Sequence, residues 1–478
     1  MNIPLLIVIG YVLLLVLISF YSVKLIKGES SGFLLAGRSW PWFMVAFMLT
    51  GLAVGGASTI GAGQMAFEKG MGAGWYTGAW GFGAVFMGLT AASMWRRLKV
   101  TTIPELFGQY YTPSARIISV IIQFIIVMTT CCLQFVAGGA LLSAMLPQYF
   151  TMFSGSLLTA VIFVFITLIG GLWAGGLANL VNVVVIWVGI VAGAIAANRF
   201  AGGYDSIVSK LPVGKVEYFD LFQGVGLTLI VAWFIVFMFT ATSHQAVIQT
   251  GFAAKNAKAS KWGFIGGGLI MAPLGFLAAY IGIAAKAVYP EIPSVQALPT
   301  IIMQGNQWIA GLTLSGLWAA DISTGVALLT SAATIIQKDI YEWNLERKGE
   351  TTDNEKSIRL FRVLVFVLGV IGFLMALKFT SIISTLLFAL SLLAPFSIIF
   401  FFTVLAPKFC KRESAFWTIF VGLVLAAMWA FIPAFAGFWK GLGLIHPVYM
   451  EVVVTLPLFI ILNLLLKNRI PEIKFYED

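Results

Sequence analysis

The stretch Gly51-Leu-Ala-Val-Gly-Gly-Ala-Ser-Thr-Ile-Gly-Ala-Gly-Gln64 lies inside an apolar run over residues 41–66. Its five glycines among fourteen residues lower the propensity for helix sharply. Main-chain carbonyls that are freed at the depth of the lipid hydrocarbon are tolerated only against a cavity or an ion. The stretch therefore predicts a broken membrane helix beside a binding site, and close packing of helices through small residues is the alternative.

The composition of the whole chain is that of a membrane protein. Of the 478 residues, 60% are hydrophobic and only 10% are charged, and apolar runs long enough to cross a bilayer recur throughout. We predict an all-α polytopic membrane protein with about thirteen transmembrane helices, the first of them too long for a cleaved signal. The expected spans are approximately residues 3–26, 41–66, 72–95, 117–146, 154–173, 178–199, 222–245, 262–288, 307–337, 359–377, 380–405, 414–436 and 446–466.

The basic residues are distributed unevenly between the segments that connect these spans. A net charge of +10 by itself suggests an acidic partner such as nucleic acid. However, 22 of the 29 Lys and Arg residues fall in segments that are cytoplasmic when the N-terminus is outside. Because this bias follows the positive-inside rule, we expect a multi-pass protein of the cell membrane, with its C-terminus in the cytoplasm and with no affinity for nucleic acid.

A second unusual stretch, Leu317-Trp-Ala-Ala-Asp-Ile-Ser-Thr-Gly-Val-Ala327, lies in the expected ninth span. It places Asp321, Ser323 and Thr324 where polar oxygens are costly unless they meet a partner, a water-filled cavity or an ion. The stretch therefore indicates a binding site. The alternative is that the hydroxyls bond back to carbonyls one turn earlier, which is common for Ser and Thr in membrane helices.

The expected seventh span contains a weaker polar interruption, Phe237-Met-Phe-Thr-Ala-Thr-Ser-His-Gln245. Its histidine, His244, taken alone is typical of a structural or solvated helix end. If the second and seventh spans each begin one of two inverted repeats, the interruptions occupy corresponding positions. Such paired interruptions are the best sequence indication of a transporter's site at the membrane midplane.

Four segments now carry a resemblance to a known family, and the similarity extends from about residue 5 to residue 410. The chain is similar to the sodium/solute symporter family, which includes bacterial proline and pantothenate permeases and the sodium/glucose transporters. The segments are Phe33-Leu-Leu-Ala-Gly-Arg38, Thr102-Ile-Pro-Glu-Leu106 with Arg116, His244-Gln-Ala-Val-Ile-Gln249 with Ala253-Ala-Lys255, and Ser331 to Tyr341. Their order and their placement on the expected spans make the signal specific.

The resemblance implies the leucine-transporter fold, in which two inverted repeats of five helices work by alternating access. The first repeat is then expected in residues 41–200 (spans two to six) and the second in 222–405 (spans seven to eleven). Residues 1–30 supply an extra N-terminal helix, 414–466 two extra C-terminal spans, and 467–478 a cytoplasmic tail. The implied activity is sodium-coupled symport of a small organic solute, with the bilayer, the solute and Na⁺ as the partners.

The resemblance also implies a set of sodium ligands. The family's site takes main-chain oxygens from the broken second span and a carbonyl plus two hydroxyls from the ninth, which correspond here to Ala57, Ile60, Ala320, Ser323 and Thr324. The last three fall at positions i, i+3 and i+4, so they share one face of a helix. Five hard oxygens suit a small alkali cation better than a soft metal.

The chain departs from the family's pattern at three positions. Some members bind a second sodium with an aspartate in the sixth span, where this chain has Asn179, so a second site is in doubt. Proline permeases carry an aspartate in the broken helix where this chain has Thr59. In compensation Asp321 lies beside the expected ligands, and it can neutralise a bound sodium, serve as a proton site or bond to a neighbouring helix.

The expected solute site is rich in aromatic surface and poor in charge. Because sugar carriers place an asparagine where this chain has Phe237, we expect a small amino acid, a monocarboxylate or a vitamin-like solute. The residues expected to face the central cavity are Gln64, Tyr76, Trp80, Trp233, Phe237 and Thr240.

Two alternatives to sodium-coupled symport remain, and they differ in strength. A proton-coupled carrier or a sodium-independent uniporter of the same fold is the closest. A membrane sensory module is less favoured. We do not expect an enzyme, because the sequence has neither a His-Glu-x-x-His pair nor a recognisable nucleophile with its base.

Overall fold

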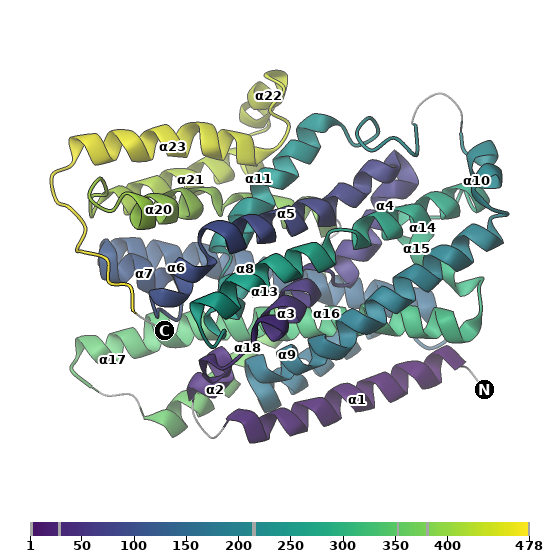
Figure 1. Cartoon of the computed structure of the whole chain (residues 1–478), viewed down its shortest axis with the longest axis horizontal. Coiled ribbons are helices and arrows are strands. Elements are labelled where there is room, and N and C mark those ends of the chain that lie inside the picture. The colour runs from purple at the N-terminus through teal and green to yellow at the C-terminus, as the bar shows by residue number, and fades with distance from the viewer. Residues whose placement is uncertain (1–2, 27–29, 213–216, 351–352, 379–381, 477–478) are drawn as a thin grey trace.

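The computed structural model describes residues 3–26, 30–212, 217–350, 353–378 and 382–476, without the side chains of residues 56, 57 and 382–384. Most helices run roughly parallel to the long axis of the molecule (Figure 1). The start of α1 at Ile3 and the last described residues, which end at Tyr476, lie toward opposite ends of this bundle (Figure 1). Within the described residues the only β structure is two isolated bridges, so the expected all-α class is confirmed.

The long helices correspond closely to the expected spans. They are α1 (Ile3–Ile26), α3 (Trp42–Ala53), α4 (Gly56–Lys69), α5 (Trp75–Thr90), α8 (Pro113–Met145), α9 (Met152–Phe200), α11 (Leu227–Ser243), α12 (Gln245–Phe252), α13 (Ala257–Met271), α14 (Leu274–Val288), α16 (Gln307–Ile336), α18 (Asn354–Ala376), α19 (Ile382–Ser391), α20 (Ala394–Leu405), α21 (Ser414–Phe431) and α23 (Pro447–Leu465). Shorter helices connect them: α2 (Ser30–Leu35), α6 (Ala92–Arg97), α7 (Ile103–Tyr110), α10 (Tyr204–Lys210), α15 (Ala297–Met303), α17 (Trp343–Arg347) and α22 (Pro433–Gly441).

The count of thirteen spans is not confirmed. In the described part of the chain nine helices are long and apolar enough to cross a membrane, or eleven if each of two bent pairs is one span. Two features account for most of the difference. The expected spans 154–173 and 178–199 form one helix of 49 residues, α9, and the expected span 72–95 is interrupted at Ala91, which leaves α5 with 16 residues.

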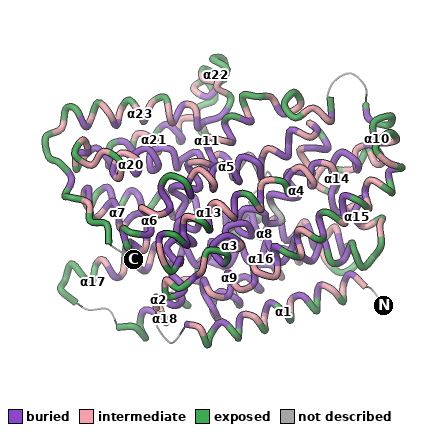
Figure 2. The backbone as a smooth tube through the Cα atoms, viewed as in Figure 1, coloured by how far each residue is buried: buried purple, intermediate pink, exposed green. Residues whose placement is uncertain are grey.

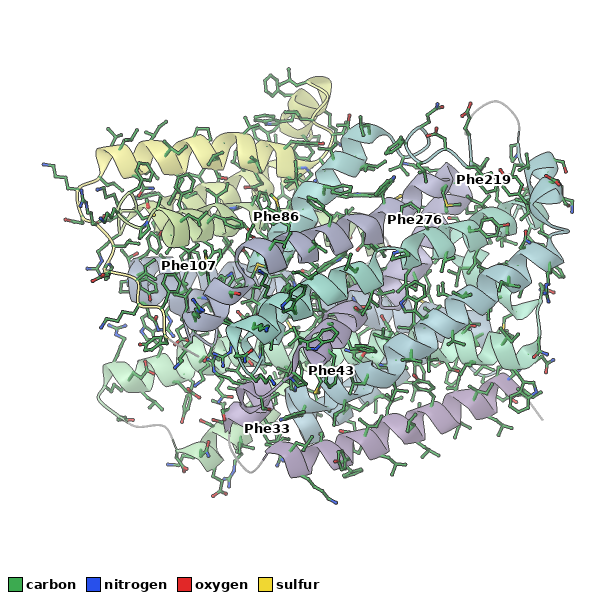
Figure 3. All side chains as sticks on the ribbon, viewed as in Figure 1. Phe33, Phe43, Phe86, Phe107, Phe219 and Phe276 are labelled. Carbon is green, nitrogen blue, oxygen red and sulfur yellow. The ribbon has the colours of Figure 1, made fainter. Side chains whose placement is uncertain are left out.

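Helix α9 has to bend because 49 residues of straight helix would extend about 73 Å, more than twice the thickness of the hydrocarbon core. The bend lies at Gly171, whose φ of +49° is favourable only for glycine. A Cβ atom there would also lie 2.7 Å from the carbonyl oxygen of Phe33. Phe33, at the α2 end of the molecule, packs against this kink (Figure 3).

Helix α16 is the centre of the bundle. Of the 18 most apolar consecutive residues in this helix, 94% are buried. In α1, α18, α21 and α23, only about a third of such residues are buried. Buried segments accordingly gather around α16, α8 and α3, and exposed ones line the edges (Figure 2). Polar residues on α16 are therefore surrounded by other helices and do not face lipid.

The segments that carry the family resemblance meet in space. The Gln249 side chain donates to the Leu34 carbonyl at 2.6 Å and accepts from the Ser331 hydroxyl at 2.8 Å. Trp40 forms a two-bond bridge with the segment at residues 253–255, with distances of 2.9 and 2.8 Å. One glutamine thus joins three segments that are far apart in the sequence.

Candidate functional site

Two helix breaks lie at the middle of the bundle. Val54 and Gly55 separate α3 from α4, which are bent by 46°, and His244 alone separates α11 from α12, which are bent by 48°. Both interruptions expected from the sequence are therefore present. Both breaks pack against α16.

The hydroxyl of Thr324 connects α16 to the first break. Its Oγ1 donates to the carbonyl oxygen of Gly51, in the last turn of α3, at 2.8 Å, and also lies 2.9 Å from the carbonyl oxygen of Ala320. Gly55 also lies next to this hydroxyl, because a Cβ atom added to Gly55 would lie 3.2 Å from Thr324 Oγ1. The broken helix and the hydroxyl face of α16 are thus in direct contact.

Ser323 belongs to a different set of bonds. Its Oγ has two acceptors within reach of its single proton, Ala320 O at 2.9 Å and Asn179 Oδ1 at 2.6 Å, and it accepts from Asn182 Nδ2 at 3.0 Å. Both hydroxyls therefore bond back to Ala320, as the alternative interpretation of the sequence requires, and both also reach another helix. Tyr11 on α1 donates to Asn182 Oδ1 at 3.0 Å and completes this network.

The remaining expected sodium ligands lie on α4. Ile60 is buried. Ala57 lies in the first turn of α4, and its side chain is outside the described part of the chain. Thr59 donates its hydroxyl to the Gly55 carbonyl at 3.1 Å, beside a similar bond of 2.9 Å from Ser58. The hydroxyl of Thr59 is therefore directed at the break itself.

Asp321 is fully buried, and its carboxyl group lies against α8. Its Oδ2 lies 3.0 Å from the position that a Cβ atom on Gly138 of α8 would occupy. Thr159 of α9 lies at the same point, and its hydroxyl accepts a 3.0 Å bond from the Trp318 indole. The carboxyl group thus lies between α16, α8 and α9.

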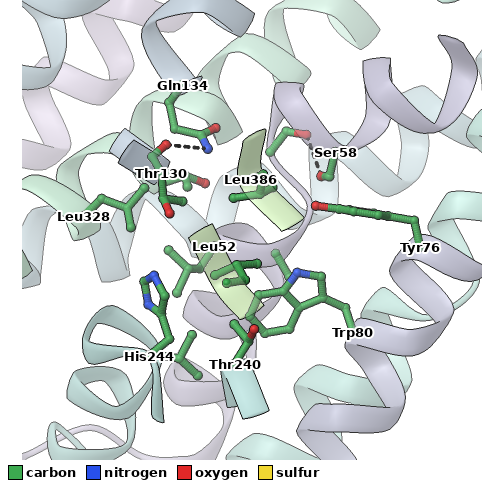
Figure 4. A pocket seen from close by; sticks show the side chains of 15 residues that line it. Leu52, Ser58, Tyr76, Trp80, Thr130, Gln134, Thr240, His244, Leu328 and Leu386 are labelled. Atoms are coloured by element: carbon green, nitrogen blue, oxygen red, sulfur yellow. Dashed lines mark hydrogen bonds between the residues drawn. The ribbon is translucent and has the colours of Figure 1, made fainter. Parts of the chain in front are cut away.

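The six residues expected to bind the solute separate into three places. Tyr76, Trp80 and Thr240 line a small central cavity of about 40 Å³ beside the first break (Figure 4). Gln64 and Trp233 line a wider cavity of about 880 Å³, which also reaches Lys69 and Lys440.

The sixth residue, Phe237, lies behind the central cavity. Its ring stacks on Trp80 with 5.0 Å between ring centroids and meets Tyr76 edge-on at the same distance. Phe237 therefore supports the aromatic wall, and it is not among the residues that line either cavity.

The structure adds two residues that the sequence did not single out as binding residues. Gln134 and His244 line the central cavity opposite Tyr76 and Trp80 (Figure 4). Both are at least 95% buried, at 4% and 3% exposed. Gln134 lies in a long apolar run of α8, where one polar residue was the only available signal, and His244 was interpreted as a structural helix end.

A comparison with protein families decides what this arrangement is. The model of the sodium:solute symporter family matches residues 33–422, which is most of the chain. The chain belongs to this family. This symporter therefore couples the movement of a small solute to that of Na⁺, and its family consists of transporters.

Its similarity to curated relatives is moderate. The sodium/pantothenate symporter of Haemophilus influenzae is 26% identical over 370 residues, which cover 72% of this chain and 73% of that protein. The osmoregulated proline transporter OpuE of Bacillus subtilis is 23% identical over 403 residues and 80% of each chain. The sodium/glucose cotransporter 1 of Oryctolagus cuniculus is 23% identical over 72% of this chain and 58% of its own length.

Solved structures confirm the fold of the symporter. A Na⁺-coupled sialic acid symporter in a substrate-bound, outward-open state superposes with a TM-score of 0.78 at 16% identity, covering 98% of both chains. The transporter MhsT, solved with L-phenylalanine, superposes with a TM-score of 0.55 at 15% identity and covers 87% of this chain and 97% of its own. The expected leucine-transporter-type fold is therefore confirmed.

Proposed function

We propose that this symporter takes up a small organic solute with Na⁺ bound at the first helix break. The ligands in this proposal are main-chain oxygens of Ala57 and Ile60, the Ala320 carbonyl, and the hydroxyls of Ser323 and Thr324. The single observation that carries the proposal is the 2.8 Å contact between Thr324 and the Gly51 carbonyl, because it joins the broken helix to the hydroxyl face of α16.

The chemistry of the ligands supports a small cation. A hydroxyl has one proton and two lone pairs, so Ser323 can keep donating to Asn179 Oδ1 and Thr324 to Gly51 O while a lone pair of each faces an ion. All five proposed ligand atoms are uncharged oxygens, which suit a hard monovalent cation. Asp321 is one residue from Ala320 and supplies negative charge nearby without entering the ligand set.

We further propose that one sodium ion suffices. Where some relatives of the family carry an aspartate for a second ion, Asn179 accepts from Ser323 and donates to Met48 Sδ at 3.1 Å. An amide that is engaged in this way supplies no charge for a second cation. The network of Asn179 and Asn182 therefore orients Ser323 for the single site.

In this proposal, each of the two inverted repeats begins with one of the two broken helices. Residues 41–200 and 222–405 form the inverted repeats, which rock against each other for alternating access. The N-terminus lies outside and the C-terminus in the cytoplasm, in agreement with the first and last described residues, which lie toward opposite ends of the bundle (Figure 1). The wide cavity that reaches Lys69 and Lys440 is then the outer vestibule.

The solute class in this proposal is an amino acid, a monocarboxylate or a vitamin-like molecule. The named relatives include symporters for pantothenate and for proline. No Lys or Arg is among the described residues that line the central cavity, so an isolated anion would lack a protein cation there. Sodium bound beside the cavity would provide that charge.

Uptake into vesicles that contain the purified protein tests the coupling. An inward Na⁺ gradient should drive accumulation of the solute, and an inward proton gradient in choline buffer should not. Accumulation that follows the proton gradient alone would show a proton-coupled carrier, and equilibration without either gradient would show a uniporter.

A further inference from the structure

The central cavity contains two polar side chains whose hydrogen-bonding groups are directed into it. Gln134 donates its amide hydrogens to the Thr130 carbonyl at 3.3 Å, and within the described chain its Oε1 has no hydrogen-bond partner. Neither ring nitrogen of His244 has a partner among the described residues. Burying such groups without partners is costly, so each is expected to bond to whatever fills the cavity.

Three hydroxyls of the cavity wall have already used their protons. Ser58 donates to Gly55 O at 2.9 Å, Thr240 to Val236 O at 2.8 Å, and Thr324 to Gly51 O at 2.8 Å. What these hydroxyls offer to the cavity is therefore lone pairs. Together with Gln134 Oε1, they make one side of the wall rich in acceptors, to which a neutral His244 adds one donor and one more acceptor. The Tyr76 hydroxyl and the Trp80 indole N–H are further donors on the opposite side of the cavity.

An occupant that complements the acceptor-rich side around Gln134 has to bring donors. A carboxylate brings acceptors only, whereas an amino or hydroxyl group brings one to three N–H or O–H donors. The rings of Tyr76 and Trp80 add faces that attract an ammonium group. The apolar part of the wall, which includes Leu52 and Leu386, leaves a narrow volume that favours a compact solute.

The polar wall and the proposed sodium site adjoin each other at Gly55. A Cβ atom on that residue would lie 3.2 Å from Thr324 Oγ1 and 3.4 Å from Gln134 Oε1. A solute can therefore place a carboxylate toward the ion and a neighbouring donor toward Gln134. 2-Amino and 2-hydroxy acids carry a carboxylate and a hydrogen-bond donor on adjacent carbon atoms.

We propose that Gln134 and His244 determine the specificity of this symporter, and that they select a compact 2-amino or 2-hydroxy acid over a carboxylate without a donor. The proposal rests on the sodium site described above. It narrows the solute class, because it excludes simple monocarboxylates.

A series of three-carbon acids tests this selection directly. L-Alanine, L-lactate and propionate share one skeleton and differ at carbon 2 in carrying an ammonium, a hydroxyl or only hydrogen. Transport of each acid is measured as the influx of ²²Na⁺ into vesicles that an inward gradient of that acid drives. We expect alanine and lactate to drive influx at half-saturating concentrations at least about tenfold lower than propionate, the effect of one to two lost hydrogen bonds.

Variants assign the selection to the two residues. Gln134→Leu and His244→Leu should each remove the preference over propionate, whereas His244→Asn, which keeps a donor and an acceptor, should retain most of it. Thr330→Val is the matched control, because it deletes a buried hydroxyl of α16 that has no hydrogen-bond partner in the described chain and lines neither of the two cavities. A purely structural role would impair all three acids equally.

The outcomes separate this proposal from the proposed function. Stabilisation of each variant by Na⁺ in thermal unfolding shows that the sodium site and the fold are intact. If propionate drives influx as well as alanine does, or if none of the three acids drives it while Na⁺ still stabilises the protein, the selection proposed here is wrong. Loss of Na⁺ stabilisation in the wild type would instead contradict the sodium site itself.

Discussion

The two helix breaks have almost the same bend, 46° and 48°, but they are built from different groups. The first consists of Val54 and Gly55, which expose main chain and bring it to Thr324. The second is the single residue His244, in a run of polar side chains from Thr240 to Gln245. Main-chain oxygens suit a hard cation and side-chain groups discriminate between organic molecules, so equivalent breaks can divide ion binding and solute recognition between them.

The largest effect is expected from bulk at the first break. Gly55→Leu would push a side chain against Thr324 Oγ1 and Gln134 Oε1, which lie 3.2 and 3.4 Å from the position of its Cβ. We expect complete loss of solute-driven ²²Na⁺ influx, with the protein still inserted in the membrane. Gly10→Leu is the control, since Gly10 is exposed on α1 and has no atom within 4 Å of its Cβ position. Normal transport by Gly55→Leu would show that the break does not approach the site.

A smaller effect is expected from the charge of Asp321. If the carboxylate supports the ion from between α16, α8 and α9, Asp321→Asn should weaken Na⁺ binding by about tenfold or more at every pH, which corresponds to a lost attraction of at least about 1.4 kcal/mol. Calorimetric titration at two pH values measures this. A mutant that keeps its Na⁺ affinity and loses the pH dependence of transport would make Asp321 a proton site, and one that only unfolds at a lower temperature would make it structural.

The smallest effect is expected from Asn179. Asn179→Ala removes the acceptor 2.6 Å from Ser323 Oγ but leaves its bond to Ala320. The half-saturating Na⁺ concentration should rise about threefold, as for one hydrogen bond that orients a ligand, and the number of ions per transport cycle should not change. A fall in that number would show that Asn179 belongs to a second sodium site.

Much of this arrangement could be read from the sequence because it depends on local composition. The glycines at 51–64 and the polar residues at 321–324 are conspicuous inside apolar runs, and the structure brings both to one place. Gln134 could not be recognised in this way, because its function depends on which helices surround α8. The direction of Asp321 was equally hidden, since a position on a helix face does not reveal the neighbouring helix.

The position at which α9 breaks could not be read from the sequence for a related reason. Gly171 adopts its non-helical conformation through close approach of Phe33, a contact between residues far apart in sequence. Nothing in the local sequence distinguishes a kinked helix from two helices with a short connection. The same limitation applies to Ala91, where α5 ends within a run that is apolar throughout.

The central claim is that Na⁺ binds to the hydroxyls of α16 at the first break. The most direct test is calorimetric titration of Na⁺ into the purified double variant Ser323→Ala, Thr324→Val in choline buffer. Its control is Ser315→Ala, Thr330→Val, which makes the same chemical changes on the same helix at two buried hydroxyls without side-chain hydrogen-bond partners in the described residues. The account predicts at least about a tenfold loss of Na⁺ affinity in the first variant and none in the control. Equal affinity in the two variants and the wild type would contradict it.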